Sequence, residues 1–241
     1  DGRILFDMNE DRLDLRVSTY PTLYGEKSVL RLLNISDAMH DLDGLGFEKD
    51  ILNRFEDMLI GGEGIILVSG PTGSGKTTTL YSTLNKMDNP DVNIVTIEDP
   101  IEYDLDNINQ AQVNRRSGVT FASALRAILR QDPDIIMVGE VRDEETVELA
   151  IRAALTGHLV FSTIHTNDSA AGFTRLLNWG MEPFLITSTV KGILAQRLVR
   201  KLCKECREKH MVEPSELERF GLEVDEAMEF YKAVGCLSCR N

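Results

Sequence analysis

The chain has 241 residues, a formal net charge of −13 at pH 7, and 42% hydrophobic residues. This is enough apolar material for one large domain or two modest ones, which excludes a disordered chain. No run approaches the roughly 18 apolar residues of a membrane-spanning helix. The acidic balance argues against a protein whose main work is to grip a nucleic-acid backbone. Because the sequence starts at Asp1 without a methionine and stops at Asn241 right after a cysteine pair, we expect a piece of a longer protein.

The first 33 residues alternate between apolar and polar positions, as β-strands do, and Pro21 and Gly25 punctuate them. Three short strands are too few for an independent core. We therefore expect residues 1–33 to be the end of a truncated N-terminal domain, and the acidic, turn-rich residues 34–46 to be a linker.

From Phe47 onward, helix-like and strand-like runs alternate. Residues 47–60 carry apolar side chains at a helical period. The alternation then continues through the segments 65–68, 76–87, 92–97, 121–130, 135–138, 146–155 and 159–164. This order predicts an α/β fold with a mostly parallel sheet and helices on both faces. Beyond Ser169 the pattern predicts helix up to Leu202.

The segment GPTGSGKTTTL, Gly70 to Leu80, matches the phosphate-loop pattern G-x-x-x-x-G-K-[ST]. It stands between a strand-like run and a helix-like run, which is the context that the pattern requires. Its glycines let successive backbone N–H groups point at phosphate oxygens, and a helix N-terminus adds partial positive charge. The residues expected to bind nucleotide are Gly70, Pro71, Thr72, Gly73, Ser74, Gly75, Lys76, Thr77 and Thr78.

Two residues of this loop have distinct expected roles. Lys76 reaches the outer phosphates as a point charge, and Thr77 offers its hydroxyl to Mg²⁺. Ser74 and Thr78 supply further donors. The alternative, a glycine-rich turn with a chance Lys-Thr pair, does not explain why strand, loop and helix agree.

Two strands of the expected sheet end in acids. Residues 92–97 lead into Glu98 and Asp99, and residues 135–138 lead to Glu140. Open α/β sheets bind ligands at the carboxyl ends of their strands, and nucleotide hydrolysis needs acids near the γ-phosphate. Either Glu98 or Glu140 could orient or deprotonate the attacking water while the other holds Mg²⁺. The sequence does not separate these roles.

Other polar residues near these strands also have more than one possible role. Asp99 and Asp134 could instead cap helices or turns. His165 follows the strand-like run 159–164, so it is a candidate phosphate contact, whereas His158 is expected to be structural.

All four cysteines fall in two C-x-x-C pairs with 29 residues between the pairs. They are Cys203, Cys206, Cys236 and Cys239. Each pair lets two thiolates reach one metal, and four thiolates are typical of a structural zinc site without an open catalytic position. The alternatives are disulfides or free thiols, but a disulfide scaffold does not suit a reducing compartment. The gap leaves room for a helix within residues 214–230.

Four segments together resemble the ATPases of type II secretion and type IV pilus assembly. They are GPTGSGKTTTL, TIEDPIEY from Thr96 to Tyr103, LRQDPDIIMVGEVRD from Leu129 to Asp143, and TGHLVFSTIHTND from Thr156 to Asp168. In that family they are the phosphate loop, the aspartate box, an atypical Walker B segment and the histidine box. The resemblance covers nearly the whole chain and implies a RecA-like P-loop NTPase core.

The resemblance also implies roles for single residues. It makes Glu140 the Walker B acid, Glu98 a water-positioning acid and His165 a sensor of the γ-phosphate. Arg16 and Arg31 occupy the positions at which the family supplies two arginines to the active site from the preceding domain. The alternative for both arginines is salt bridging on the surface of a strand.

The same resemblance implies a domain organisation and a function. Residues 1–33 would end a PAS-like domain, 34–46 would be a linker, 47–202 a RecA-like ATPase domain and 203–241 a tetracysteine zinc subdomain. The implied function is an ATP-hydrolysing motor whose domain closure drives pilus or pseudopilus assembly and protein export. The implied cofactors are ATP, Mg²⁺ and structural Zn²⁺.

The implied partners are copies of the chain itself, as a hexamer, and inner-membrane platform proteins. Through these partners the protein would associate peripherally with the cytoplasmic face of the inner membrane, and no nucleic acid is expected. Two other classes remain open. A nucleic-acid translocating or packaging motor could use the same core, although no basic, aromatic stripe is visible. A nucleotide-gated adaptor that does not hydrolyse ATP could use its surfaces only for docking.

Overall fold

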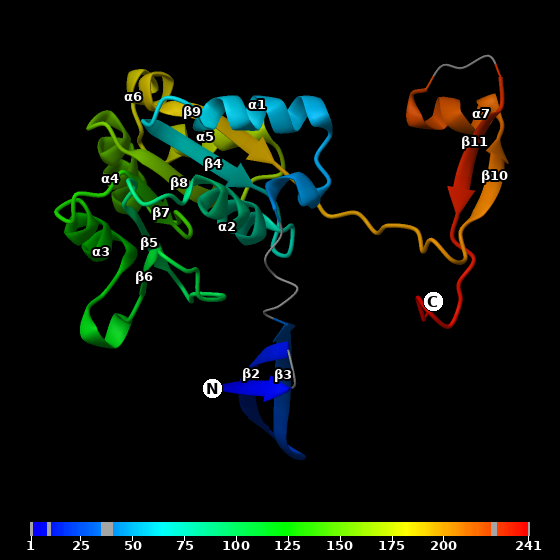
Figure 1. Ribbon diagram of the computed structural model, residues 1–241, viewed down its shortest axis with the longest axis horizontal. Helices are drawn as coiled ribbons and strands as arrows, with labels where there is room; N and C mark the ends of the chain where they lie inside the picture. The colour runs from blue at the N-terminus through cyan, green and yellow to red at the C-terminus, as the bar shows by residue number, and fades with distance from the viewer. Residues whose placement is uncertain (1, 9–10, 35–40, 223–225, 241) are drawn as a thin grey trace. The chain divides into compact units, whose positions relative to one another are not determined.

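The computed structural model describes residues 2–8, 11–34, 41–222 and 226–240. These residues belong to two compact units, Asp1–Arg197 and Leu198–Asn241. The first unit holds an antiparallel sheet and a larger parallel sheet, and the second holds a two-stranded sheet (Figure 1).

The strands expected in the first 33 residues form a three-stranded antiparallel sheet. They are β1 (Gly2–Met8), β2 (Asp11–Thr22) and β3 (Gly25–Asn34). The register places Arg16 directly opposite Arg31, so these two residues share one face of the sheet. The other face carries several apolar residues, namely Ile4, Phe6, Leu13, Leu15, Val17, Leu30 and Leu32.

A six-stranded parallel sheet forms the centre of the first unit, in the order β6-β5-β7-β8-β4-β9. Its strands are β4 (Gly64–Ser69), β5 (Ile94–Glu98), β6 (Asn109–Gln112), β7 (Ile135–Val138), β8 (Leu159–Ile164) and β9 (Val190–Ala195). Every pairing in this sheet is parallel. The carboxyl ends of β5, β7, β8 and β4 therefore lie side by side at one edge of the sheet.

Helices cover both faces of this sheet (Figure 1). One face carries α1 (Lys49–Leu59) and α2 (Lys76–Met87), and the other carries α3 (Phe121–Ile128), α4 (Glu144–Leu155), α5 (Ser169–Asn178) and α6 (Pro183–Thr189). Alternate residues of each central strand serve the two faces: Ile66 packs with the α1 and α2 side, and Ile65 with the opposite side. Burial on both faces explains why these strands read as continuous apolar runs. The short 3-10 helices η1 (Leu42–Leu45) and η2 (Arg115–Ser117) complete this unit.

The helical pattern expected up to Leu202 is wrong beyond Thr189. Residues 190–195 form β9, which pairs in parallel with β4 at the edge of the sheet. Glycine suits position 192 because it has no Cβ atom; a Cβ atom there would lie 2.2 Å from the Met58 Sδ atom of α1. Residues 190–195 form a strand rather than a helix because the backbone of β4 needs a hydrogen-bonding partner on that side. The local periodicity of the sequence does not reveal such a need.

The second unit contains β10 (Glu208–Val212), α7 (Pro214–Leu217), η3 (Glu218–Phe220) and β11 (Met228–Lys232). The two strands pair in antiparallel fashion. The helix expected within residues 214–230 is therefore short, and the end of that segment is a strand instead. Within the described residues, no helix combines the length and the apolar character needed to cross a membrane.

Candidate functional site

The phosphate loop connects β4 to α2 and has the backbone that its glycines predict. Gly70, Gly73 and Gly75 have φ angles of 150°, 75° and 83°, a region that residues with a side chain avoid. A Cβ atom on Gly70 would lie 2.5 Å from both the Gln196 carbonyl oxygen and the Ser74 Oγ atom. Helix α2 begins at Lys76, directly after the loop. The free N–H groups of its first turn therefore lie next to the loop, as an anion site requires.

Two polar side chains in this loop, those of Lys76 and Ser74, could bind an anion. The Lys76 Nζ atom donates to the carbonyl oxygens of Gly70 and Pro71, at 3.0 Å each. Burial lowers the pKa of Lys76, and the nearby charge of Glu140 opposes this effect. The Ser74 Oγ atom is buried and has no hydrogen-bond partner among the described residues. Phosphate oxygens would satisfy both groups, so the loop fits the phosphates of a nucleotide.

Glu140 and His165 lie beside this loop, after the neighbouring strands β7 and β8. The Glu140 Oε2 atom is 3.8 Å from the His165 Nε2 atom, and the Glu140 Oε1 atom is 2.6 Å from the Arg142 Nη2 atom. The side chain of Glu140 is 13% exposed, so it is reachable from solvent. The structure thus brings Lys76, Glu140 and His165 together.

Glu98, the other expected acid, has a different environment. It ends β5 and is 3% exposed. Its carboxylate accepts hydrogen bonds from the hydroxyl of Tyr81, from Thr96 Oγ1 at 2.6 Å and from Gln110 Nε2 at 3.1 Å. Burial raises the pKa of Glu98, and these hydrogen bonds partly oppose the rise. Its backbone lies next to the end of β7, because a Cβ atom on Gly139 would be 3.4 Å from the Glu98 Cα atom.

Sequence reasoning missed Tyr81. Its hydroxyl donates to Glu98 and accepts from the backbone N–H of Glu102 at 3.3 Å, and its ring packs edge-on against Tyr103. Tyr81 therefore connects α2 to the segment that follows β5. Within the sequence it is one apolar position of a helix, and no local signal points to a carboxylate 17 residues away.

The two arginines of the small sheet differ in their contacts. The Arg16 Nη2 atom lies 2.7 Å from the Glu102 carboxylate and donates to the Ile101 carbonyl at 3.0 Å. Arg31 is exposed. Arg16 is thus bound to the segment after β5, which the resemblance identifies as the aspartate box.

The remaining polar candidates have structural contacts. The Asp134 carboxylate accepts from the Asn93 N–H at 2.7 Å, at the opposite edge of the sheet from the phosphate loop. The His158 Nδ1 atom lies 2.9 Å from the Ala153 carbonyl at the end of α4. Asp99 lies 3.7 Å from Arg115 in an exposed ion pair.

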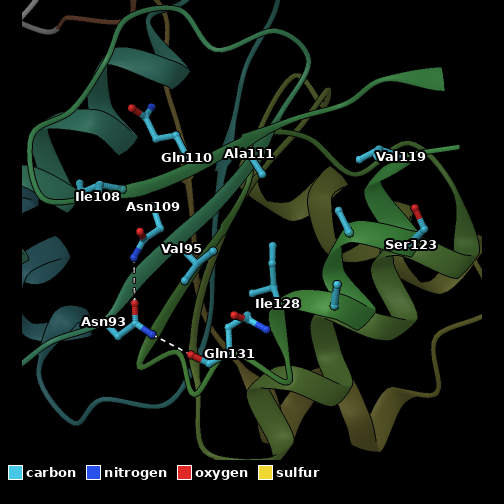
Figure 2. A pocket seen from close by; sticks show the side chains of 12 residues that line it. Asn93, Val95, Ile108, Asn109, Gln110, Ala111, Val119, Ser123, Ile128 and Gln131 are labelled. Atoms are coloured by element: carbon cyan, nitrogen blue, oxygen red, sulfur yellow. Dashed lines mark hydrogen bonds between the residues drawn. The ribbon is translucent and has the colours of Figure 1, made fainter. Parts of the chain in front are cut away.

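A groove of about 720 Å³ lies between β6 and α3 (Figure 2). Asn93 closes one end of it by accepting from the Asn109 side chain and donating to the Gln131 carbonyl. None of the residues expected to bind nucleotide or to act on it lines this groove. The groove is therefore separate from the phosphate loop.

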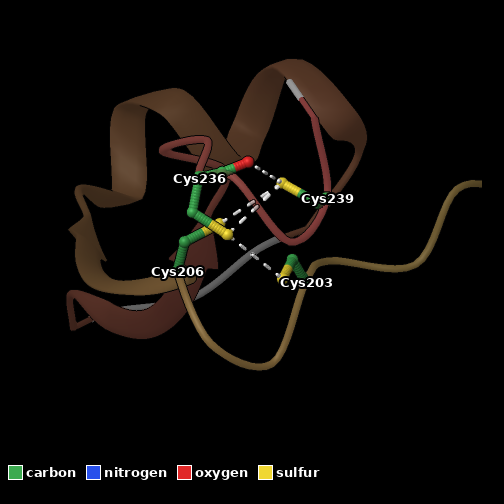
Figure 3. A group of neighbouring side chains, drawn as sticks. All are labelled: Cys203, Cys206, Cys236 and Cys239. Carbon is green, nitrogen blue, oxygen red and sulfur yellow. Dashed lines mark hydrogen bonds between the residues drawn. The ribbon is translucent and has the colours of Figure 1, made fainter.

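The four cysteines meet in the second unit (Figure 3). The Sγ atoms of Cys203 and Cys236 are 3.9 Å apart, and the pairs Cys206/Cys239 and Cys236/Cys239 are both at 3.8 Å. A disulfide would need an S–S distance of about 2.05 Å. Four zinc–sulfur bonds of about 2.3 Å in a tetrahedron place the sulfurs about 3.8 Å apart. The cluster therefore has the size of a four-thiolate metal site.

The fold and the loop define the class of the protein. A parallel sheet, a glycine-rich loop after its strand β4 and a helix that begins at the loop's lysine make this a P-loop NTPase fold. The chain belongs to the Type II/IV secretion system protein family, whose model matches residues 1–241.

Several curated relatives are similar over almost the whole chain. The type II secretion system protein E of Xanthomonas campestris pv. campestris is 55% identical over 92% of this chain and 39% of its own length. The type IV pilus assembly ATPase PilB of Thermus thermophilus is 49% identical over 99% of this chain and 27% of its own length. The type II secretion system ATPase E of Vibrio cholerae is 48% identical over 100% of this chain and 48% of its own length. The chain thus spans half or less of these relatives.

Two solved structures, one of an ATPase and one of a pilus motor, are also similar to this chain. The Legionella pneumophila ATPase DotB matches with a TM-score of 0.67 and 28% identity, over 83% of this chain and 58% of DotB. The pilus retraction motor PilT with bound ADP matches with a TM-score of 0.63 and 30% identity, over 95% of this chain and 62% of PilT.

Proposed function

We propose that this chain is the catalytic part of an ATP-hydrolysing motor for type II secretion or type IV pilus assembly. The observation that carries the proposal is the meeting of Lys76, Glu140 and His165 beside a phosphate loop, at the carboxyl ends of three adjacent strands. Relatives named as ATPases of both machines support it.

The chemistry follows from these positions. The loop N–H groups and the N-terminus of α2 bind the phosphates, and Lys76 exchanges its two carbonyl partners for phosphate oxygens. The Thr77 hydroxyl would hold Mg²⁺, which would supply positive charge to the phosphates. Glu140 orients the attacking water and accepts its proton, and His165 contacts the γ-phosphate.

The two acids separate in this proposal. Glu140 is partly exposed and lies beside Lys76, whereas Glu98 is buried with three hydrogen-bond donors around its carboxylate. Glu140 is therefore the acid at the reacting phosphate. Glu98 acts from its buried position by holding the segment after β5 through Tyr81.

Arg16 and Arg31 complete the site when the small sheet moves toward the nucleotide. A planar guanidinium suits the equatorial oxygens of a phosphoryl group in transfer. Motion of the small sheet would then be coupled to hydrolysis, which is how a motor converts chemistry into movement.

The remaining features of the proposal concern assembly. Zinc in the four-cysteine cluster stabilises the second unit, because four thiolates leave no open coordination position. The motor works as a hexamer on inner-membrane platform proteins, at the cytoplasmic face of that membrane. Relatives that are named for type II secretion and type IV pilus assembly support this setting.

A binding experiment tests the proposal. Lys76→Ala should weaken binding of ATP about 10- to 100-fold, because it removes a charge-assisted contact to the phosphates. Lys86→Ala is the matched control, since Lys86 lies in the last turn of the same helix and pairs with Glu56 at the surface. Wild-type affinity in Lys76→Ala, measured by calorimetry, would contradict the loop assignment.

A further inference from the structure

Gln196, a residue to which the sequence assigns no role, makes three hydrogen bonds to the phosphate loop and to the two elements that flank it, β4 and α2. It directly follows β9, and its backbone N–H donates to the Ser69 carbonyl at 2.9 Å. Its side-chain Nε2 atom donates to the Ser74 carbonyl at 2.6 Å. Its Oε1 atom accepts from the Thr79 hydroxyl at 2.9 Å. One amide group thus joins the middle of the loop to the first turns of α2.

The contact with Ser74 fixes the direction of a neighbouring N–H group. In a trans peptide the carbonyl oxygen and the following N–H point to opposite sides. Because the Ser74 carbonyl points at Gln196, the N–H of Gly75 points away from Gln196. Successive N–H groups of this kind are what a phosphate loop uses to bind its anion.

The position of Gln196 in the sheet supports this orientation. Strand β4, which leads into the loop, has β9 on one side and β8 on the other. Gln196 follows β9, and His165 follows β8. The loop is therefore flanked by Gln196 on one side and by His165 on the other, and the Gly75 N–H is directed away from the Gln196 side.

The surroundings leave little freedom for another arrangement. Thr79 is 2% exposed and Ser74 is 3% exposed, so both partners of the amide are buried. At Gly70 a Cβ atom would lie 2.5 Å from the Gln196 carbonyl oxygen. The backbone of Gln196 is thus packed against the entry of the loop, and its side chain has both ends satisfied.

The geometry points to Gln196 as a positioning residue of the nucleotide site, which orients the Ser74–Gly75 peptide for phosphate binding. The inference rests on the proposed function, because it needs a phosphate at the loop. The role requires a donor at one end and an acceptor at the other. Among similar side chains, glutamate at neutral pH is acceptor-only, and methionine provides no donor and only a weak acceptor.

Calorimetric binding of a non-hydrolysable ATP analogue with Mg²⁺ tests the inference. At pH 8, Gln196→Glu and Gln196→Met should each raise the Kd about 10-fold, because the Ser74 carbonyl loses its donor. When the pH falls toward about 5, the glutamate gains an O–H donor next to a carbonyl that favours its protonated form. The ratio of the Gln196→Glu Kd to the wild-type Kd should then shrink, and the Gln196→Met ratio should stay constant.

A second pair of variants tests the other end of the amide without any change in charge. Thr79→Val removes the hydroxyl that Gln196 accepts from, and Thr79→Ser keeps it. Thr79→Val should weaken binding, and Thr79→Ser should restore wild-type affinity. If a Gln196 variant does not fold, as judged by thermal melting, this pair still tests whether Gln196 is a positioning residue.

Two results would overturn the inference alone. One is an analogue affinity that Gln196→Glu or Gln196→Met leaves unchanged at pH 8, and the other is an equal affinity in Thr79→Val and Thr79→Ser. A wild-type protein that does not bind the analogue at all would instead overturn the proposed function, and this inference with it.

Discussion

Glu140 and His165 face each other across the ends of two neighbouring strands, with 3.8 Å between the Glu140 Oε2 and His165 Nε2 atoms. The parallel register of β7 and β8, in which Val138 lies opposite Ser162, brings both residues to the same edge of the sheet. Two groups able to bind or transfer protons thus lie together on the β8 side of the phosphate loop. The site therefore holds candidate groups for proton transfer in addition to a loop that suits an anion.

Removing the charge of Glu140 tests its role in hydrolysis. Glu140→Gln should lower kcat by about 10²- to 10⁴-fold, because the attacking water loses its base, while ATP affinity stays close to that of the wild type. Phosphate release measures the rate, and calorimetry measures binding. Glu145→Gln is the matched control, since Glu145 is exposed and pairs with Arg126 on the surface of α4. An undiminished rate in Glu140→Gln would assign the base to another residue, whereas turnover that is lost while binding is retained would dismiss the adaptor interpretation.

The buried position of Glu98 predicts a pH dependence of stability. Burial raises the pKa of Glu98 above its ordinary value of 4.5, so in the window just above that value the folded protein binds this proton more tightly than the unfolded chain. The contribution of Glu98 to the free energy of unfolding therefore falls as pH rises through the window. Glu98→Gln removes this titration.

Denaturant unfolding between about pH 4 and pH 7 measures this effect. The stability of Glu98→Gln relative to the wild type should increase as pH rises, whatever its offset at low pH. Glu48→Gln, which changes an exposed carboxyl, should follow the wild-type curve. Parallel curves for Glu98→Gln and the wild type would show that the Glu98 carboxyl does not titrate differently on folding.

The sequence predicts features that depend on local pattern. The start of α2 at Lys76 follows from the glycine-rich loop, and the burial of β7 and β8 follows from continuous apolar runs. The meeting of Glu140 with His165 follows from one further step, since parallel strands share a carboxyl edge. For these features, no contact between distant residues had to be known.

Features that depend on distant partners could not be predicted in this way. Residues 190–195 have a pattern compatible with a helix, and only the open edge of β4 makes them a strand. The Gln196 amide bonds to a carbonyl 122 residues earlier in the chain. Tyr81 looks like an apolar helix position until Glu98 is placed beside it. In each case a tertiary contact decides between local alternatives that have similar energies.

The four-cysteine cluster predicts that zinc is needed for the fold of the second unit only. Elemental analysis should find one zinc per chain, and Cys203→Ser should lower the zinc content and loosen the β10–β11 hairpin. Hydrogen exchange of the backbone measures that loss, while protection in the parallel sheet should be unchanged. Ser238→Ala, between the two cysteines of the last pair, is the matched control. A metal-free protein with a fully protected hairpin would contradict the zinc assignment.

The ion pair between Arg16 and Glu102 leads to a prediction about the role of Arg16 in hydrolysis. In the structure this arginine is bound to the segment after β5, and it must leave Glu102 to reach a phosphate. Arg16→Ala should therefore lower kcat by at least about 10-fold, with little change in ATP affinity, because an arginine that acts on the transition state contributes little to binding of the ground state. Lys27→Ala, an exposed cation on β3, should leave both quantities unchanged.

Glu102→Gln distinguishes this catalytic role from surface salt bridging. If the ion pair only stabilises the fold, Arg16→Ala and Glu102→Gln should lower the free energy of unfolding alike, by up to about 1 kcal/mol, and leave kcat unchanged. If Arg16 acts on the phosphate, Glu102→Gln frees it, so kcat should stay at or above the wild-type value while Arg16→Ala loses activity. Unchanged turnover in Arg16→Ala, measured on the oligomer, would assign Arg16 a structural role and leave motion of the small sheet uncoupled from hydrolysis.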